Sequence, residues 1–372
     1  MLGQMLQLFP VDQSLLQQIL SLIFYGIFFL YLFFGQSIQT QRVLYSLSGA
    51  LNKIKDARDK STKELQTFLQ KNGYKGDATP QIDKLIEYFT ITPVSIDPAG
   101  LVKKIEHLLS VRDERVRYEV KKLLPEKDSV TTSIMENLLE ISTTLNLYYK
   151  VVRHYYLVGK KTSNYYLLLQ LQIILPDLLR EVEALFSAVE PIKSGQPIGD
   201  GIGALVAGKL MLNSEKKPIA RDTIFSEVPY KNRKLYVIKA EGPAANVGQP
   251  GNAIESLVNK YGVKPSTIIM IDAALKLEGE ATGEVAEGVG AAIGGIGVDK
   301  YKIEEIASSM GIPLYAIIIK ESIVEAITAM TKEIAEAASK VHSRLDALIE
   351  SNTKEGDIIM VVGVGNTLGV GQ

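Results

Sequence analysis

Residues 357–372, DIIMVVGVGNTLGVGQ, join a short apolar run to a glycine-rich loop, and this stretch decides the fold that we expect. The run from Asp357 to Val362 has the length and composition of a buried β-strand. Four glycines punctuate the loop that follows: Gly363, Gly365, Gly369 and Gly371. A strand that enters such a loop normally precedes a helix whose N-terminus faces a ligand.

No helix follows this loop in the sequence, so we expect its helix to come from elsewhere. The best candidate is PIGDGIGALVAGKL, residues 197–210, where Asp200 opens a helix that begins near Gly201. Domain termini often lie close together, so the two pieces can form one strand–loop–helix unit in space. In that case 357–362 is a central strand of a permuted sheet, and Asn366 lies close to Asp200.

The composition excludes several classes of protein. The chain has 372 residues, enough for two domains, and its 41 Lys and Arg against 42 Asp and Glu argue against a general nucleic-acid binder. It has no cysteine, which rules out disulfides, thiolate zinc sites and cysteine nucleophiles. Its three histidines are not spaced like metal ligands. We therefore expect no histidine-rich metal centre, and nothing in the sequence identifies a cofactor.

The first 40 residues look like a membrane anchor. No charged residue occurs from Gln13 to Gln41, and Ile19–Phe34 is almost wholly apolar, so that with its flanks the run has roughly the 20 residues that a spanning helix needs. Basic residues follow this run, which places the rest of the chain in the cytoplasm, at the cell membrane. A buried hairpin helix or an interfacial segment is the alternative.

Residues 41–190 are expected to form a helical domain. Apolar residues at helical spacing predict a helix over 41–72. Further helices are expected at 80–91, 98–110, 113–124, 128–159 and 162–190. Tyrosines gather between Tyr148 and Tyr166, where they can form an interfacial belt, a nucleic-acid stacking surface or ordinary helix packing, the commonest of the three.

Residues 191–372 are expected to form an α/β domain with a doubly wound, mostly parallel sheet. Apolar runs of strand length occur at 234–239, 267–271, 314–319 and 357–362. Helical patterns separate them at 201–212, 251–261, 300–310 and 321–350. Apolar strands that alternate with helices indicate a parallel sheet covered on both faces. The apolar stripe of 321–350 can cover this sheet or form a homo-oligomer interface.

Two aspartates lie where such sheets bind ligands, at the carboxyl ends of strands. Asp272 directly follows the strand at 267–271, and Asp200 opens the helix near Gly201. Each has a structural explanation, because Asp is a preferred helix N-cap. Two carboxylates that converge near a glycine loop can instead bind a metal, or share a proton and activate water.

Three glycine-containing loops supply candidate ligand-binding residues. The first loop contributes Asn246, and the second contributes Gly294, Gly295 and Gly297. The third, after the strand at 357–362, contributes Gly363, Gly365 and Asn366. None of the loops matches a P-loop or a complete dinucleotide-binding fingerprint.

Motifs after Ile271 resemble those of the spore germination endopeptidase family. They are IDAAL at 271–275, GIGV at 295–298 and MGIPLYAI at 310–317. That family has an Ile-Asp-Ala-Leu motif, a Gly-Ser-Gly-Val loop and a Leu-Gly-Ile-Pro-Val strand in the same order. The related hydrogenase maturation endopeptidases are similar at Asp272.

Both families begin their domain with a strand ending Gly-x-Gly-Asn, an acidic residue and a Gly-containing helix. Here VVGVGNTLG at 361–369 and GDGIGALV at 199–206 are separated. The resemblance implies a circularly permuted phosphorylase/hydrolase-like fold, in which Asp200 and Asp272 match the aspartic pair of the germination protease. The metal-binding histidine of the hydrogenase relatives has no counterpart in a suitable loop. The whole chain resembles a membrane-anchored archaeal family known only as a domain of unknown function, whose anchor also ends Phe-Phe-Gly-Gln.

These patterns leave three functions open. The first is a membrane-anchored hydrolase, acting on a protein or peptide, in which Asp200 and Asp272 activate water. The second is a binding or scaffold protein whose glycine loops hold a nucleotide or an anionic metabolite. The third is a purely structural role for both aspartates. The substrate, the partners and the oligomeric state are not encoded in these patterns.

Overall fold

The structure is a computed structural model that describes residues 13–91, 93, 98–295 and 297–371, without the side chains of residues 13–16, 33, 98 and 99. Contacts divide the chain into two compact units. The first, which we call the helical unit, joins residues up to Lys55 with Tyr148–Leu179. The second, the sheet unit, joins Asp56–Leu147 with Arg180–Gln372. Each unit is described by itself.

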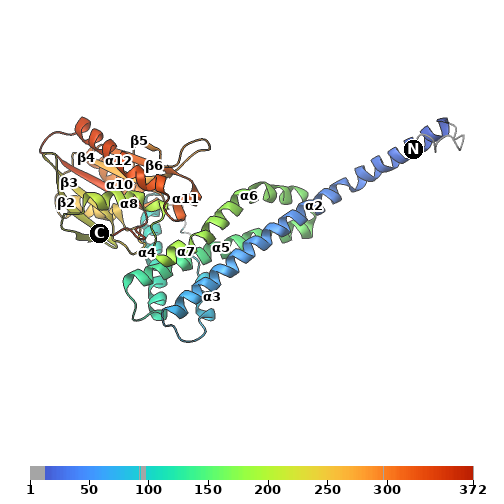
Figure 1. The fold of residues 1–372 in the computed structure, drawn as a ribbon, viewed down its shortest axis with the longest axis horizontal. Coiled ribbons are helices and arrows are strands. Elements are labelled where there is room, and N and C mark those ends of the chain that lie inside the picture. Colours follow the sequence, from blue (N-terminus) through green and yellow to red (C-terminus); the bar gives the residue numbers. More distant parts are fainter. Residues whose placement is uncertain (1–12, 92, 94–97, 296, 372) are drawn as a thin grey trace. The chain divides into compact units, whose positions relative to one another are not determined.

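The first half of the chain is helical, as expected. It comprises α2 (Gln13–Lys71), α3 (Thr79–Ile86), α4 (Pro98–Leu123), α5 (Ser129–Thr162), α6 (Tyr165–Ser187) and α7 (Val189–Ser194) (Figure 1). The two helices expected at 98–110 and 113–124 are one helix, because no glycine or proline interrupts the chain between them. α4 ends two residues before Pro125, which disfavours helical backbone at the preceding residue.

The apolar start of α2 is exposed. Its large apolar side chains between Ile19 and Phe34, where they are described, are 47% to 78% exposed. Among the described residues, no single helix is long and apolar enough to cross a membrane. A bent pair, Gln17–Leu32 and Phe34–Lys71 at 57°, meets that test by length and composition. Burial along α2 becomes regular only from Thr40 onward.

The second half forms a seven-stranded sheet in the order β1-β2-β3-β7-β4-β6-β5. Its four middle strands are parallel: β3 (Arg233–Ala240), β7 (Ile358–Gly363), β4 (Thr267–Leu275) and β6 (Leu314–Glu321). β7 lies between β3 and β4, so the run at 357–362 is a central strand and that prediction is confirmed.

The sequence patterns missed three strands outside the parallel centre, and all three are antiparallel to their neighbours. They are β1 (Lys217–Ala220), β2 (Thr223–Tyr230) and β5 (Val285–Val289). The sheet is therefore mixed, with a parallel centre. Edge strands such as β1 and β5 carry polar residues, glycine and proline more often than central ones, and so give weaker apolar runs.

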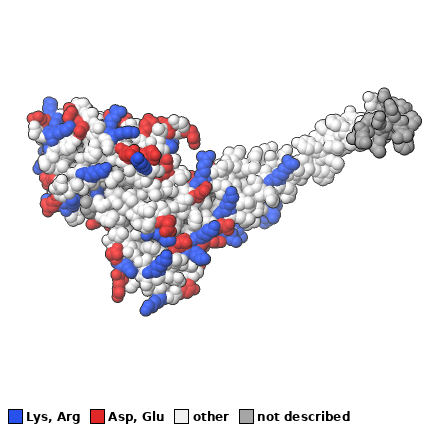
Figure 2. Space-filling view, in the orientation of Figure 1, with Lys and Arg blue, Asp and Glu red and all other residues white. Residues whose placement is uncertain are grey.

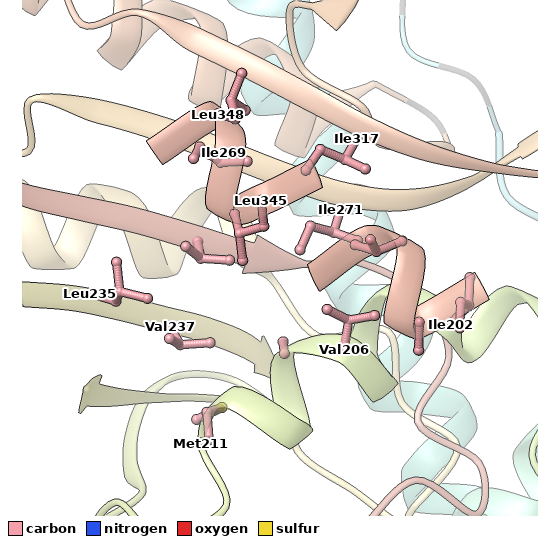
Figure 3. Packing of buried hydrophobic residues seen from close by; sticks show 14 of the residues in the cluster. Ile202, Val206, Met211, Leu235, Val237, Ile269, Ile271, Ile317, Leu345 and Leu348 are labelled. Carbon is pink, nitrogen blue, oxygen red and sulfur yellow. The ribbon is translucent and has the colours of Figure 1, made fainter. Parts of the chain in front are cut away.

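Helices cover both faces of the sheet, as expected for a doubly wound fold. Along β7 the residues alternate, so that Ile359 and Val361 pack with α8 (Ile202–Leu210) and α12 (Lys332–Asn352). Met360 and Val362 pack on the other face with α9 (Pro250–Asn259) and α10 (Val298–Met310). Figure 3 shows the first of these cores, with side chains from α8 and α12 meeting those of the strands.

The prediction of a single helix over 321–350 is wrong. Glu321 ends β6, and the remainder divides into α11 (Ile323–Ile327) and α12. Separate N-caps start the two helices: the Ser322 hydroxyl accepts the Glu325 amide, and the Thr331 hydroxyl accepts the Ile334 amide. The apolar stripe of α12 does cover the sheet.

Glycines let α8 lie directly against the ends of β7 and β4. A Cβ on Gly363 would lie 2.4 Å from both the Ala207 Cβ and the Gly203 carbonyl oxygen. A Cβ on Gly203 would lie 2.3 Å from the carbonyl oxygens of Ile271 and Val364. This close approach brings the turn before α8, the 3-10 helix η1 (Gly199–Gly201), to the carboxyl edge of the sheet.

Candidate functional site

Three acidic side chains lie close enough to interact electrostatically at the carboxyl edge of the parallel strands. Asp272 lies on β4 one position beyond Ile271, which is the partner of Gly363, the last residue of β7. Glu321 is the last residue of β6, and Asp200 lies in η1. Because β7 ends before β4 and β6 do, the edge is open there, and η1 lies against it.

Asp200 is held by the loop that follows β7. The Asn366 backbone amide donates a 2.8 Å hydrogen bond to Asp200 Oδ2, so the predicted proximity of these two residues is confirmed. Gly365 makes this possible: its φ is +123°, and a Cβ there would lie within 1.9 Å of the Asp200 carbonyl oxygen. Burial raises the pKa of the Asp200 carboxyl, while the Asn366 amide favours the ionised form.

Asp272 is 6% exposed and holds its proton unusually tightly. Burial, reinforced by repulsion from Asp200, raises its pKa to about 8. The backbone amides of Ala273 and Gly294 act in the opposite direction, and the Ala273 amide donates to Asp272 Oδ1 at 2.8 Å. At neutral pH the Asp200–Asp272 pair therefore carries less than two negative charges.

Glu321 is the functional candidate that the sequence patterns missed. It is 1% exposed, and neither carboxyl oxygen has a hydrogen-bond partner among the described residues. Burial raises its pKa to about 8, with repulsion from Asp200, Glu325 and Asp272 adding to the effect. In LYAIIIKE, residues 314–321, an acid follows an apolar run as Asp272 does, but the helical pattern after it makes Glu321 the expected start of a helix.

Asp200 and Asp272 line one cavity of about 490 Å³. The glycines Gly294, Gly295, Gly297 and Gly365 line it as well, so four of the predicted ligand-binding residues lie at this site. The N-termini of α9 and α10 reach the cavity through Pro250 and Val298. α4 forms the facing wall with Glu106, Arg112 and Asp113.

A second cavity, of about 270 Å³, adjoins the first and shares Arg112, Asp113 and the 247–249 segment with it. Asn246 and Asn366 line this second cavity. Gly363, the remaining predicted residue, lies at the end of β7 against α8, where its lack of a side chain is needed for packing.

Ion pairs tie α4 to the sheet. Arg117 of α4 donates to Asp222 at 2.8 Å and lies 3.3 Å from Glu136 of α5. Near the first cavity, Lys302 of α10 bonds Glu106 of α4 at 2.6 Å and Asn252 of α9 at 2.5 Å. The wall over the acid pair is thus attached at both of its ends.

The next question is whether the side chains at this site could bind a metal ion. Within the described ranges, no group of three or more His, Asp or Glu is arranged to hold a metal ion. His342 lies on α12, where burial lowers its pKa, and it does not line either cavity. What the arrangement can do is hold and exchange protons: two buried carboxyls share one cavity, and a third lies behind them.

Fold and site together define a doubly wound α/β domain with a buried acid cluster at its carboxyl edge, joined to a long helical segment. Residues 21–195 match the family model for the protein of unknown function (DUF1512) N-terminal domain, and residues 198–371 match the model for the domain of unknown function (DUF1512) C-terminal. The two models together cover nearly the whole chain, which belongs to this family. A search of the curated proteins found no match.

Proposed function

We propose that this protein is a hydrolase that cleaves amide bonds with Asp200 and Asp272 as a proton-sharing pair. The observation that carries the proposal is that both carboxyls line one cavity and that the charge of Asp200 helps raise the pKa of Asp272 to about 8. One neutral and one ionised carboxyl side by side are what general acid–base hydrolysis requires. The resemblance of the residues around Asp272 to the germination endopeptidase motif supports an amide substrate.

The proton transfers follow from the two environments. We assign the ionised role to Asp200, because the Asn366 amide favours its charged form against the burial that raises its pKa. In this role Asp200 takes a proton from water as the water oxygen attacks the amide carbon. Asp272, the neutral member, donates its proton to the carbonyl oxygen. Collapse of the tetrahedral intermediate then returns a proton from Asp200 to the leaving nitrogen and the hydroxyl proton to Asp272, which restores both acids.

We also infer that the first part of α2 anchors the chain in the cell membrane, with the residues from Arg42 onward on the cytoplasmic side. The support is an uncharged apolar run whose described side chains are exposed, followed by basic residues from Arg42 onward. Substrates would then be proteins or peptides that reach the cytoplasmic membrane surface.

A second candidate function is the binding of an anionic metabolite in the same cavity without turnover. Two helix N-termini, those of α9 and α10, reach the cavity, and helix N-termini attract anions. Lys302 and Arg112 also line it. Against this reading, the cavity carries more carboxyls than basic groups, namely Glu106, Asp113, Asp200, Asp272 and Asp299.

The test is proteolysis by the full chain, purified in detergent, against a diverse peptide mixture analysed by mass spectrometry. Asp200→Asn and Asp272→Asn should each lower the cleavage rate by about 10² or more, as expected for loss of a general acid or base. Glu336→Gln is the matched control, because Glu336 is exposed on α12, far along the chain from the cavity lining. Cleavage that persists in both aspartate variants refutes the hydrolase.

The binding alternative has a separate readout. A metabolite that occupies the cavity should raise the melting temperature of the wild type and of Lys302→Gln to different extents, with no change in the metabolite itself. If the wild type cleaves nothing and an anion stabilises it, the second function replaces the first.

A further inference from the structure

The end of the α5–α6 hairpin carries exposed apolar and aromatic side chains that nothing in the sheet-unit site explains. We call residues 153–174 the hairpin tip; it belongs to the helical unit together with the first part of α2. Its large exposed apolar side chains are Tyr155, Leu157, Val158, Tyr166, Ile173 and Ile174. Tyr166 is 73% exposed and Ile173 67%, values close to those of the apolar run on α2.

The hairpin tip is also basic. The sequence has no Asp or Glu between Glu140 and Asp177, whereas Arg153, Lys160 and Lys161 lie in the tip and are exposed. On the α2 side, residues 13–55 contain three basic residues and no acid. In the view of Figure 2, the outer part of these helices shows blue atoms and then only white ones. A basic surface with exposed tyrosines is complementary to anionic lipid headgroups.

The tip lies just beyond the end of the apolar run. Ser61 of α2 and Ser142 of α5 are hydrogen-bonded at 2.8 Å, and the hairpin runs back along α2 in the opposite direction (Figure 1). Twenty residues back from Ser61 is Gln41, and twenty residues on from Ser142 is Thr162, so the turn of the hairpin is level with Gln41. Gln41 follows Phe34 by seven residues, or about 10 Å of helix.

That distance is slightly larger than the thickness of one headgroup layer, which is about 5–8 Å. The hydrocarbon core of a bilayer is about 30 Å thick, and the headgroup regions bring the total to about 40–45 Å. If the apolar run of α2 ends at the core boundary near Phe34, the turn of the hairpin meets the headgroup layer or its surface. Aromatic and basic side chains are favoured at this level.

The hairpin tip has a well-packed turn that can hold its basic and aromatic side chains in fixed positions. α5 and α6 approach so closely that a Cβ on Gly159 would lie 2.5 Å from Leu168 Cδ2. Asn164 closes the turn: its amide donates to the Gly159 carbonyl at 3.1 Å, and its side chain accepts the Leu167 amide at 3.1 Å. The exposed side chains are therefore presented by a fixed turn between two packed helices.

We propose that the hairpin tip binds the anionic headgroups of the same bilayer that α2 enters. This inference rests on the anchoring part of the proposed function and is independent of the acid pair. It adds a second point of membrane contact, which orients the helical unit relative to the membrane surface. The occupant is a lipid surface, not a second copy of the chain, because the tip is both basic and aromatic and lies level with the end of the apolar run.

The absence of cysteine permits single-site labelling of the full chain. A fluorophore is attached to Ser163→Cys in the turn, to Gly26→Cys in the apolar run, and to Ser351→Cys on the exposed end of α12 as the reference. Each protein is reconstituted into phosphatidylcholine vesicles with and without phosphatidylglycerol. Quenchers are placed either on the lipid headgroups or deep in the acyl chains.

We expect acyl-chain quenching at Gly26→Cys, and headgroup quenching at Ser163→Cys that increases with phosphatidylglycerol and falls with salt. Lys160→Gln with Lys161→Gln should remove that increase, since each lysine near an anionic surface contributes about fivefold to local binding. The matched control is Lys121→Gln with Lys122→Gln, another exposed lysine pair at the end of α4, which should leave the quenching unchanged.

The outcomes separate the two inferences. If Gly26→Cys is quenched at depth but Ser163→Cys is no more quenched than Ser351→Cys, the hairpin proposal is overturned and the anchor stands. If Gly26→Cys is not quenched by the acyl-chain probe, the anchor fails and the hairpin proposal fails with it. Self-quenching at Ser163→Cys that depends on protein density and not on lipid charge identifies a second copy as the occupant, and also overturns the proposal.

Discussion

Neutralising Asp272 should change how the stability of the sheet unit depends on pH. Asp272 has its pKa raised from 3.8 to about 8 by burial and by repulsion from Asp200. Between these two values the folded state binds a proton that the unfolded state does not bind, so the free energy of unfolding falls as pH rises. The stability is fully present below pH 3.8 and is lost as pH rises toward 8.

The size of the effect follows from the same shift. One bound proton changes the free energy of unfolding by about 1.36 kcal/mol per pH unit. Over the two units from about pH 5.5 to about pH 7.5, Asp272 alone should lower the stability of the wild type by about 2–3 kcal/mol. Asp272→Asn removes this titration, keeps an oxygen to accept the Ala273 amide, and should be stabilised relative to the wild type at the higher pH.

Hydrogen exchange of the amides in β4 and β7 measures this quantity in the full chain, after correction for the intrinsic pH dependence of exchange. Glu321→Gln should also weaken the dependence of the unfolding free energy on pH, because the pKa of Glu321 is also raised to about 8. In the double variant, the change in the pH dependence of stability should be smaller than the sum of the two single changes, because Asp200 repels both acids. Glu336→Gln should follow the wild type. A slope in Asp272→Asn equal to that of the wild type would refute the reasoning.

Two further predictions test the packing around the site. Gly363→Ala should lower the free energy of unfolding by about 2 kcal/mol or more, because the new Cβ would collide with α8. Gly288→Ala on β5 is the control and should be nearly neutral in thermal unfolding, because nothing lies within 4 Å of its Cβ position. Equal melting temperatures of the two variants would contradict the close approach of α8 to β7. Arg117→Met removes the charged contacts to Asp222 and Glu136, which are worth about 1.5 kcal/mol. It should raise the rate of hydrogen exchange in α4 roughly tenfold and leave exchange in β7 unchanged. Unchanged exchange in α4 would show that these ion pairs do not hold α4 against the sheet.

The centre of the fold could be predicted because its strands are buried on both faces. β3, β4, β6 and β7 read as continuous apolar runs, and the glycines after β7 mark where α8 comes close. The glycine-rich patterns of 197–210 and 363–371 indicated that these two distant segments lie together. These signals are local and strong, so the central position of β7 and the contact between Asn366 and Asp200 followed from them.

The antiparallel strands and the full extent of β6 could not be predicted, because tertiary pairing decides them. β2 contains Glu227 and Pro229, and β5 contains Gly288, so neither has the apolar run of a central strand. Glu321 precedes SIVEAI, a helical pattern, and only its pairing with Leu275 of β4 shows that β6 extends to it. Local patterns do not report how far a strand continues once a neighbour is present.

The short central strand explains how one carboxyl, that of Asp200, can influence acids on both faces of the sheet. β7 stops at Gly363 beside Ile271, whereas β4 and β6 remain paired as far as Leu275 and Glu321. Side chains alternate along these strands, so Asp272 follows Met270 on the α9–α10 face, and Glu321 follows Ile319 on the α8–α12 face.

Asp200 enters from η1 into the space beyond β7, which is why its charge raises the pKa of both acids. Its hydrogen bond to Asn366 joins residues 166 positions apart in the chain. The position of Asp200 therefore depends on the placement of β7 between β3 and β4. Any substitution that blocks this insertion, such as Gly363→Ala, should disturb the titration of Asp272 together with the stability of the sheet.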